Sequence, residues 1–371
     1  MQMMREGKRS SERNIVTGLD IGTSKIAVII GEIAESGPMH ILGVGMSPSE
    51  GLRQGVVINL DLAVQSIEKA VHEAQLTAGI EIRNVIVGIA GDHIRSVNSR
   101  GVVAVSRADH EIMQHDVDRV IDAAKAIALP IDREVLHVLP QEFIVDNQTG
   151  IKNPVGISGV RLEAEVHIVT GAVTSAQNIV RSVQKAGLKV TGLVLEPLAS
   201  SHAVLDKNEK ELGVALIDLG GGTSDIALFY DGTIRHTAVI GLGGQNVTND
   251  IALGMRTPIE QAEKIKQKFG TCHEKMIARD DVFNVPGIGG RVPREVSRSV
   301  LASIIQPRVE EIFSLAAKEI KRSEFADLLG AGVVLTGGGS LLEGSTTLAE
   351  EIFGLPAKVG IPQGFSGLVE S

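Results

Sequence analysis

The sequence predicts an α/β fold in which two related half-domains face each other across one nucleotide cleft. A strand, a glycine turn and a second strand follow one another twice, first around Asp20 to Lys25 and again around Asp218 to Asp225. A third segment, Val333 to Ser340, runs from an apolar strand into three glycines that open a helix. One plan repeated in two distant parts of the chain indicates a duplicated core.

The second hairpin has the chemistry of a phosphate-binding turn. Gly220, Gly221 and Gly222 carry no side chains, so their backbone N–H groups can close around a phosphate. Asp218 and Asp225 at the two ends of the turn would repel that anion unless a divalent cation lay between them. Magnesium is the cation that proteins usually hold through a carboxylate, water and substrate phosphates. Taken alone, the same segment could be a β-hairpin whose turn happens to be rich in glycine.

Length and composition agree with a globular protein of more than one domain, because 371 residues exceed what one core usually holds. Apolar residues make up 43% and aromatic residues only 2%, so the cores must consist mainly of Val, Ile, Leu and Ala. The net charge of −9 argues against binding to nucleic acid. The single cysteine, Cys272, excludes an intramolecular disulfide framework and points to a reducing cytosol.

Two sequence features bear on membranes and secretion. No apolar run reaches about 18 residues, which predicts that no helix spans a membrane. Residues 1–13 are polar and charged, so we expect a disordered leader and no secretory signal.

The first core half is expected at residues 14–83 and 161–196, with an inserted β-rich module at 84–160. After the first hairpin we expect a strand at 41–46, a helix at 61–78 that Asp61 caps and Gly79 ends, and a strand at 84–90. Within the module we expect strands at 101–106, 135–139 and 143–145 and a helix at 114–128. A strand at 161–169, a helix from Thr174 or Ser175 to Ala186 and a strand at 188–195 then complete this half.

The second core half is expected at 197–242 and 324–371, with an outer lobe at 243–323. Asp231 and Gly232 predict a hairpin turn before a strand at 233–239. Helices are expected from Gly243–Gly244 to residue 255, at 259–269 after a Thr257 cap, at 295–323 with a break or kink at Pro307, and at 341–353. Residues 280–296 are expected to form an extended loop.

The two hairpins and the third glycine segment, in this order, resemble the phosphate and adenosine loops of the actin, Hsp70 and sugar-kinase superfamily. The resemblance implies an actin-like (ribonuclease H-like) core that binds ATP with Mg²⁺. Asp20 and Asp218 would hold the magnesium ion, mostly through water. The groups that would bind the phosphates are Gly22, Thr23, Ser24 and Lys25 on one side and Gly220, Gly221, Gly222 and Thr223 on the other, while Gly337, Gly338, Gly339 and Ser340 would flank the adenosine.

Three further sites in the sequence bear on the nucleotide, and two of them have two interpretations each. Glu196 matches the residue that orients the attacking water in the superfamily, whereas a Glu-Pro pair is also common at the start of a helix. Gly243 and Gly244 would bring a helix N-terminus toward the nucleotide. Glu263 and Lys266 match positions that contact adenosine in actin-like relatives, or they belong to a solvated helix face.

The match narrows to the FtsA family of bacterial cell-division actin homologues. The segments that resemble the inserted module of this family are LHVLPQEF (136–143), GIKNPVG (150–156) and SGVRL (158–162). Gly220 to Asp225, Arg235 to Thr237, Val285–Pro286 and Gly289 to Arg291 resemble it as well. The resemblance covers residues 14–368, and the module segments are its specific part, because actin, Hsp70 and sugar kinases lack that module at that place.

The FtsA resemblance implies an ATP-binding protein that self-associates head to tail into filaments and links the FtsZ ring to the cytoplasmic face of the inner membrane at the septum. It also implies contacts with other division proteins. The family continues past Gly367–Leu368 into a last helix, a linker and a basic amphipathic membrane helix, so we expect a truncated chain. Glu196 is a variable position of the family, and we expect at most slow ATP hydrolysis.

The FtsZ C-terminal tail, which mixes acidic and apolar residues, is expected on the outer lobe. Arg291, Arg294 and Arg298 cluster there in an acidic chain, next to Val300 and to Ile304–Ile305. Arginines would supply charge-assisted contacts and the helix an apolar groove. Alternatively, the apolar residues are core and the arginines form a solvated face.

Three other functions compete with this one. The type IV pilus assembly ATP-binding proteins share the inserted module, and the module segments favour the division family over them. A small-molecule kinase would need an acceptor site with a general base, and no additional Asp-rich loop suggests one. An Hsp70-type chaperone would carry a substrate-binding domain that 371 residues cannot hold.

Overall fold

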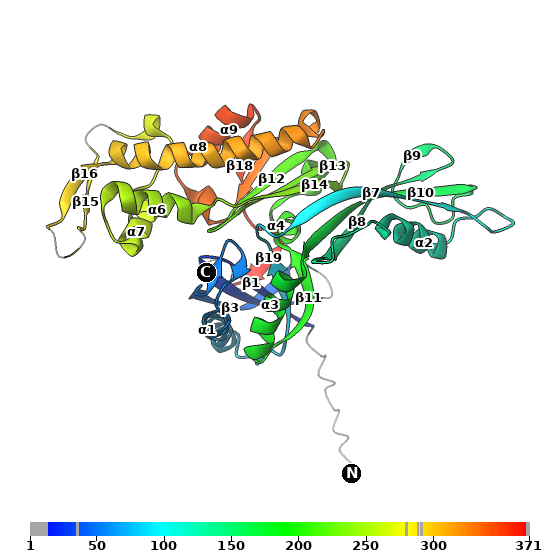
Figure 1. The fold of residues 1–371 in the computed structure, drawn as a ribbon, viewed down its shortest axis with the longest axis horizontal. Coiled ribbons are helices and arrows are strands. Elements are labelled where there is room, and N and C mark those ends of the chain that lie inside the picture. The colour runs from blue at the N-terminus through cyan, green and yellow to red at the C-terminus, as the bar shows by residue number, and fades with distance from the viewer. Residues whose placement is uncertain (1–13, 35–36, 279–280, 288, 290–291, 369–371) are drawn as a thin grey trace, which may run out of the picture.

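The computed structural model describes residues 14–34, 37–278, 281–287, 289 and 292–368. The predicted disordered leader, residues 1–13, lies outside the described residues. Figure 1 shows a central body with two extensions: the module with its sheet and helix projects to the right, and a helical lobe ending in a small hairpin lies at the left.

The first core half is built on a six-stranded sheet in the order β11-β6-β1-β2-β3-β19. Strands β1, β2 and β3 are antiparallel neighbours, and β6 runs parallel to both β1 and β11. The last strand, β19, pairs with β3, so the chain returns to the first half at its end instead of remaining in the second half as expected for 324–371. The bounds are β1 Ile15–Ile21, β2 Lys25–Glu32, β3 Met39–Pro48, β6 Asn84–Ile89, β11 Lys189–Leu195 and β19 Phe365–Gly367.

Helix α1 (Leu60–Ala78) lies directly against the backbone of β3 because two glycines make room for it. A Cβ atom on Gly45 would stand 2.1 Å from the Ala70 carbonyl oxygen, and one on Gly43 would stand 2.5 Å from that of Ala74. The helix is capped by Asn59, whose side chain accepts from the Leu62 N–H, and not by Asp61 as predicted. Gly79 ends it in the left-handed conformation, as expected. Helix α3 (Val173–Lys185) begins without the predicted hydroxyl cap.

The inserted module is a four-stranded sheet, β7-β10-β8-β9, with helix α2 (Gln114–Lys125) packed on one face. Its bounds are β7 Arg95–Ala104, β8 Arg133–Val145, β9 Gln148–Ile151 and β10 Arg161–Ala172. The two strands expected at 135–139 and 143–145 are one irregular strand, β8. The strand pairing differs from the expected module range of 84–160. Strand β6 pairs within the core sheet and so lies outside the module, whereas β10 pairs with β7 and β8 and so lies within it.

The second core half is built on a five-stranded sheet in the order β14-β13-β12-β17-β18. Asp231 and Gly232 connect β13 to β14 with φ values of 54° and 71°, which fits the predicted hairpin turn. Helix α4 (Glu196–Val204) leads from the first half into this sheet, followed by α5 (Lys207–Leu212). The bounds are β12 Val214–Leu219, β13 Ser224–Tyr230, β14 Thr233–Ile240, β17 Val333–Thr336 and β18 Ala357–Val359.

Helices α6 (Gly244–Met255), α7 (Ile259–Phe269), α8 (Arg298–Arg322) and α9 (Ser345–Phe353) complete the second half. Thr257 does not cap α7, because its hydroxyl donates to the Pro286 carbonyl. The expected loop at 280–296 contains a strand pair, β15 (Val282–Val285) with β16 (Arg294–Ser297).

Pro307 does not split α8, which runs unbroken on both sides of it. Ile305 and Val309 are buried on either side of the proline, so core packing offsets the backbone hydrogen bond that proline cannot make.

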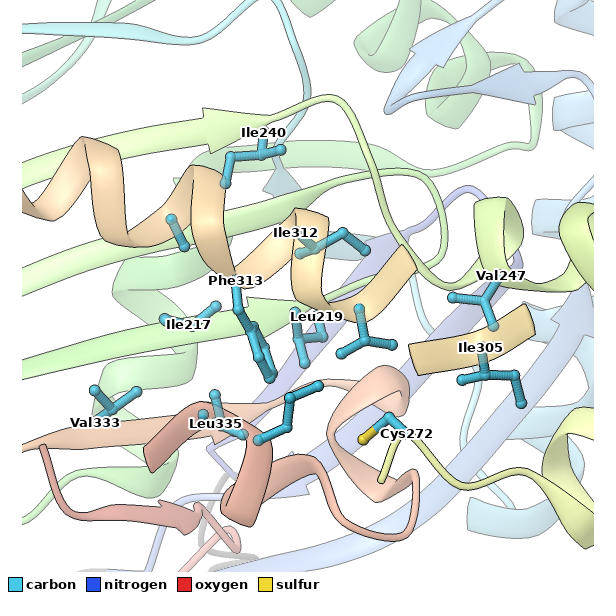
Figure 2. Close-up of a cluster of buried hydrophobic side chains, with 14 of the residues drawn as sticks. Ile217, Leu219, Ile240, Val247, Cys272, Ile305, Ile312, Phe313, Val333 and Leu335 are labelled. Carbon is cyan, nitrogen blue, oxygen red and sulfur yellow. The ribbon is translucent and has the colours of Figure 1, made fainter. Parts of the chain in front are cut away.

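The largest core lies between the second sheet and helices α6, α8 and α9. Figure 2 shows Phe313 of α8 pointing at Ile217 and Leu219 of β12 and at Leu335 of β17. Cys272 is fully buried in the same core, and burial raises the pKa of its thiol to about 12. This cysteine is therefore a packing residue and not a nucleophile.

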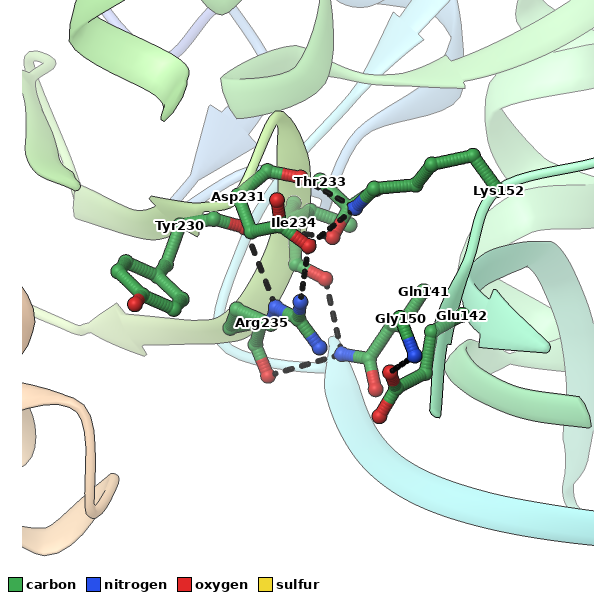
Figure 3. A network of polar contacts seen from close by, with 9 residues as sticks. All are labelled: Gln141, Glu142, Gly150, Lys152, Tyr230, Asp231, Thr233, Ile234 and Arg235. Carbon is green, nitrogen blue, oxygen red and sulfur yellow. Dashed lines mark hydrogen bonds and ion pairs between the residues drawn. The ribbon is translucent and has the colours of Figure 1, made fainter. Parts of the chain in front are cut away.

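The module is also bonded to the second half, although the chain inserts it into the first. Strand β14 forms the edge of the second sheet, and module side chains bind its outward carbonyl groups. Gln141 Nε2 donates to the carbonyls of Ile234 (2.8 Å) and Arg235 (3.3 Å), as Figure 3 shows. Lys152 forms an ion pair with Asp231 at the β13–β14 turn. The module therefore bridges the two halves along an otherwise open sheet edge.

Replacing Gln141 with leucine should lower the free energy of unfolding by about 1–3 kcal/mol, because the buried Ile234 carbonyl would lose its side-chain donor and the Arg235 carbonyl would keep only Asn98. Chemical denaturation measures this change. Glu142→Gln is the matched control, since Glu142 only accepts from the Gly150 N–H and a glutamine keeps an acceptor oxygen. Equal stabilities of Gln141→Leu and the control would show that the bridge contributes nothing.

Candidate nucleotide and metal site

The turns of the two predicted phosphate hairpins meet where the two halves face each other. A Cβ atom on Gly221 would stand 1.8 Å from Ser24 Oγ, and one on Gly222 would stand 2.6 Å from Thr23 Oγ1. No side chain could replace these glycines without moving the turns apart. The structure thus brings together the predicted phosphate-binding groups of both halves.

Four carboxylates converge beside the two turns. Asp20 lies near the end of β1, and Asp218 lies near the end of β12 directly opposite Asp225 on β13. Glu196 is the first residue of α4, and its side chain lies against β6, 3.0 Å from where a Cβ atom on Gly88 would be. Two hairpins and the helix that joins the halves therefore supply one acidic cluster.

Burial and mutual repulsion of these carboxylates make the cluster a favourable place for positive charge. Burial, reinforced by repulsion from Asp218, raises the pKa of Asp20 to about 6 and that of Asp225 to about 7. Burial also raises the pKa of Asp218, and burial together with the other three carboxylates raises that of Glu196 well above its ordinary value. Asp20 keeps solvent-accessible surface. Positive charge placed here would relieve the repulsion.

The cluster fits a hydrated magnesium ion better than one ligated directly by several side chains. Within the described ranges, no three His, Cys, Asp or Glu side chains stand close enough to hold one metal ion between them. Asp225 Oδ1 is buried without a hydrogen-bond partner, whereas Asp218 Oδ2 accepts from the Ser200 hydroxyl at 2.8 Å. Mg²⁺ commonly keeps most of its waters, and such waters could reach these carboxylate oxygens.

The predicted adenosine segment lies against the same cluster. Gly337 has φ of 78°, and a Cβ atom there would stand 2.4 Å from Asp218 Oδ1. A short 3₁₀ helix (Gly338–Leu341) follows, and Ser340 Oγ donates to the Gly337 carbonyl at 2.7 Å. Ser340 is buried, so its hydroxyl shapes the turn.

Gly243 and Gly244 lie beside the second phosphate turn, but their N–H groups are already engaged. The N–H groups of Gly244 and Gln245 donate to the carbonyls of Gly220 and Gly221, and that of Gly243 donates to Asn246 Oδ1. The N-terminus of α6 therefore holds the glycine turn in place, where the sequence had suggested direct approach to the nucleotide.

Glu263 and Lys266 lie next to this helix start. Lys266 Nζ donates to the Gly244 carbonyl at 3.0 Å and to Thr248 Oγ1 at 2.8 Å, and it forms an ion pair with Glu263. Lys266 is largely buried, so these two residues are not simply a solvated face.

The arginines predicted to bind a partner on the outer lobe are not all available to do so. Arg298 donates to the Phe269 carbonyl and forms ion pairs with Asp281 and Glu343, so it holds the lobe together. Arg294 is exposed and makes one backbone bond, to the Met255 carbonyl. Arg291 lies outside the described residues.

Of the apolar residues near these arginines, some belong to the core and one is exposed at the surface. Ile305 is fully buried and Ile304 packs against the core, whereas Val300 is 49% exposed. The predicted apolar groove therefore keeps only Val300 of its three residues at the surface.

One residue of the site, Ser200, went unassigned from the sequence, and Asp225 was expected beside a cation but not among the residues that hold it. Asp225 belongs to the glycine motif itself, and its position opposite Asp218 follows from the register of the hairpin. Ser200 follows Glu196 by four residues, and that helical spacing could have indicated a second polar group aimed at the same site.

Comparison with known proteins places the chain in a family. A family model described as "Cell division protein FtsA" matches residues 215–371, and one described as "SHS2 domain inserted in FTSA" matches residues 91–170. The cell division protein FtsA of Pseudomonas aeruginosa is 50% identical over 356 residues, which cover 96% of this chain and 85% of that protein. The chain belongs to the FtsA family.

This membership confirms the cell-division role expected from the sequence, and the structural neighbours confirm the actin-like fold. A structure described as "PilM-PilN type IV pilus biogenesis complex" matches with a TM-score of 0.65 and 16% identity, covering 93% of this chain and 87% of that one. The MreB5 structure of Spiroplasma citri bound to ADP matches with a TM-score of 0.57 and 14% identity, covering 94% and 92%. At these identities the likeness is one of fold, so the pilus alternative is not favoured.

In the described part of this FtsA family member, no helix combines the length and hydropathy needed to cross a membrane. The module boundaries of the family model, 91–170, agree with the sheet pairing, which places β6 outside the module and β10 within it.

Asp225→Asn should stabilise the protein in EDTA, because it removes a buried charge next to Asp218. The folded pKa is raised above the ordinary value of 3.8, so the ionised group destabilises the fold increasingly as pH rises from about 4 to about 7. We expect a gain of about 1–3 kcal/mol in the free energy of unfolding at pH 8 and none near pH 4.

Denaturation of both proteins across this pH range provides the measurement. Asp122→Asn, at a side chain that is 73% exposed, is the control and should change little at any pH. A pH-independent gain, or a loss at pH 8, would rule out charge repulsion at Asp225.

Proposed function

We propose that this FtsA family member binds Mg·ATP between its two glycine turns and uses the bound state in cell division, as a filament-forming link between FtsZ and the cytoplasmic membrane. The observation that supports it most is the meeting of the turns from opposite halves beside four carboxylates. The ADP bound in the MreB5 structure lends support, since that protein shares the fold.

Each predicted group would have a defined task at this site. Asp20 and Asp218 would hold Mg²⁺ through water, and Mg²⁺ would offset the negative charge of the phosphates. Backbone N–H groups of the two turns would bind phosphate oxygens, with the Lys25 ammonium group beside Asp20 on the same side. The segment from Gly337 would flank the adenosine.

Glu196 would orient a water molecule toward the terminal phosphate. Burial and the neighbouring carboxylates raise the pKa of Glu196, so protonation competes with accepting a hydrogen bond from water. No arginine is among the described groups that shift the pKa values of the four carboxylates, and this also favours slow hydrolysis. A cytoskeletal protein needs the bound state to persist, and slow turnover suits that need.

Filament formation would use the module as one contact surface and the outer lobe of the second half as the other. The module projects from one end of the molecule and the lobe from the other (Figure 1). A head-to-tail contact between two different surfaces does not close and therefore generates a filament. Attachment to the inner face of the cytoplasmic membrane would need a basic amphipathic helix of the kind that the family carries near its C-terminus.

The FtsZ tail would bind the outer lobe at the start of α8. Arg294 and Val300 are the exposed residues of the predicted set, and Val292, 86% exposed, adds an apolar side chain nearby in sequence. An arginine beside exposed valines could bind a short segment that mixes acidic and apolar residues.

Asp218→Ala should weaken ATP binding about 10- to 100-fold in magnesium and much less in EDTA, because the residue acts through the metal. Calorimetric titration under both conditions provides the test. Glu196→Gln is the matched control: it should keep the affinity for Mg·ATP and lower any hydrolysis. Equal weakening of Asp218→Ala with and without magnesium would contradict the metal role.

Arg294→Glu should reduce binding of an FtsZ C-terminal tail peptide by about tenfold or more, since attraction becomes repulsion. Lys318→Glu, an exposed position further along α8, is the control for the change in charge. Fluorescence anisotropy with a labelled peptide measures both. If the two variants bind the peptide equally well, the tail binds elsewhere.

A further inference from the structure

A small hairpin between β3 and α1 reaches the first phosphate turn. It consists of β4 (Leu52–Arg53) and β5 (Val56–Val57), joined by a two-residue turn at Gln54–Gly55. Its base is closed by the N–H groups of Ile58 and Asn59, which both donate to the Gly51 carbonyl.

The backbone of the hairpin tip is fixed to the first half. The Gly55 N–H donates to Thr23 Oγ1 at 3.0 Å, so the tip holds a hydroxyl of the first phosphate turn. A Cβ atom on Gly55 would stand 2.6 Å from the Ala90 carbonyl oxygen, and one on Gly91 would stand 2.9 Å from that of Gln54. The tip is therefore wedged between the phosphate turn and the end of β6.

From this fixed tip, the Gln54 side chain reaches the second half. Its Nε2 donates to the Gly241 carbonyl at 2.8 Å, and a Cβ atom on Gly241 would stand 3.4 Å from the same nitrogen. Gly241 lies in the loop before α6, whose first N–H groups hold the carbonyls of Gly220 and Gly221. A continuous series of bonds thus joins the first phosphate turn to the second.

The backbone of Gln54 adopts a conformation that favours glycine, and the contact of its side chain accounts for a glutamine at this position. Gln54 has φ of 50° and Gly55 has φ of 75°, the pattern of a type I′ turn, in which glycine, asparagine or aspartate is preferred at the first position. Glycine would relieve the strain at no steric cost. Glutamine, unlike glycine, carries a side-chain amide, and that amide makes the contact with the other half.

We propose that Gln54 is a positioning residue of the nucleotide site, whose amide holds the two phosphate turns in register and slows release of the nucleoside triphosphate bound between them. The inference rests on the proposed binding of Mg·ATP. Gln141 and Lys152 of the module also reach the second half, but they bind β14 and the β13–β14 turn, whereas Gln54 binds the loop before α6.

Two variants separate the amide from the strained backbone. Gln54→Gly removes the amide and relieves the strain, whereas Gln54→Glu keeps the shape and the strain but replaces the donor with a carboxylate facing a carbonyl group. Stopped-flow release of a fluorescent ATP analogue in magnesium should be about fivefold faster or more in both, the effect of one lost hydrogen bond. Arg53→Ala, at the exposed neighbouring position, should release at the wild-type rate.

Thermal unfolding without nucleotide tells the positioning role from a merely structural one. Gln54→Gly should unfold at the wild-type temperature or above it, because it removes strain. Faster release from a protein that is not less stable supports the proposal. Release at the wild-type rate from both variants, or faster release that only follows lost stability, overturns it.

A nucleotide-free measurement keeps this inference distinct from the proposed function. Spin labels at Leu76→Cys on α1 and Ile259→Cys on α7 report the separation of the halves, since both positions are well exposed and Cys272 is fully buried. The distance distribution should broaden in both Gln54 variants and superimpose on wild type in Arg53→Ala. Unchanged distributions would overturn the role of Gln54, whereas a wild-type protein that binds no ATP would overturn the proposed function.

Discussion

The close approach of two glycine turns is the contact on which the rest of the molecule depends. Gly221 and Gly222 leave room only for the hydroxyls of Thr23 and Ser24, so the two halves can meet at this point only if their backbones carry no side chains there. The approach brings carboxylates from both hairpins together, and their mutual repulsion and burial raise several pKa values. A site of this kind is stable with a cation and under electrostatic stress without one.

Other elements hold the two halves in this arrangement. The N-terminus of α6 fixes the second glycine turn, the Gln54 hairpin fixes the first, and the module binds the open edge of β14. The terminal strand β19 returns to the first sheet beside β3. Because the Gln54–Gly241 and Gln141–Ile234 bonds cross between the halves, a change in the separation of the halves on nucleotide binding would reach the module as well as the site.

The sequence predicted the parts of the fold that repeat or have local signals. The two hairpins, the glycine segment at Gly337 and the turn at Asp231–Gly232 all lie where they were expected, because glycine at fixed offsets from apolar strands has few structural meanings. Pairing between distant strands has no such local signal. The return of β19 to the first sheet, the assignment of β6 and β10, and the engagement of Arg298 in ion pairs depend on tertiary contacts that no single segment encodes.

A nucleotide bound between the two glycine turns would be held by both halves of the molecule. A crystal structure with magnesium and a non-hydrolysable ATP analogue tests this arrangement most directly. We expect phosphate density within hydrogen-bonding distance of the Gly22–Ser24 and Gly220–Thr223 backbones, with a hydrated magnesium ion facing Asp20 and Asp218. Nucleotide bound by one half alone, or at a site away from both turns, would contradict it.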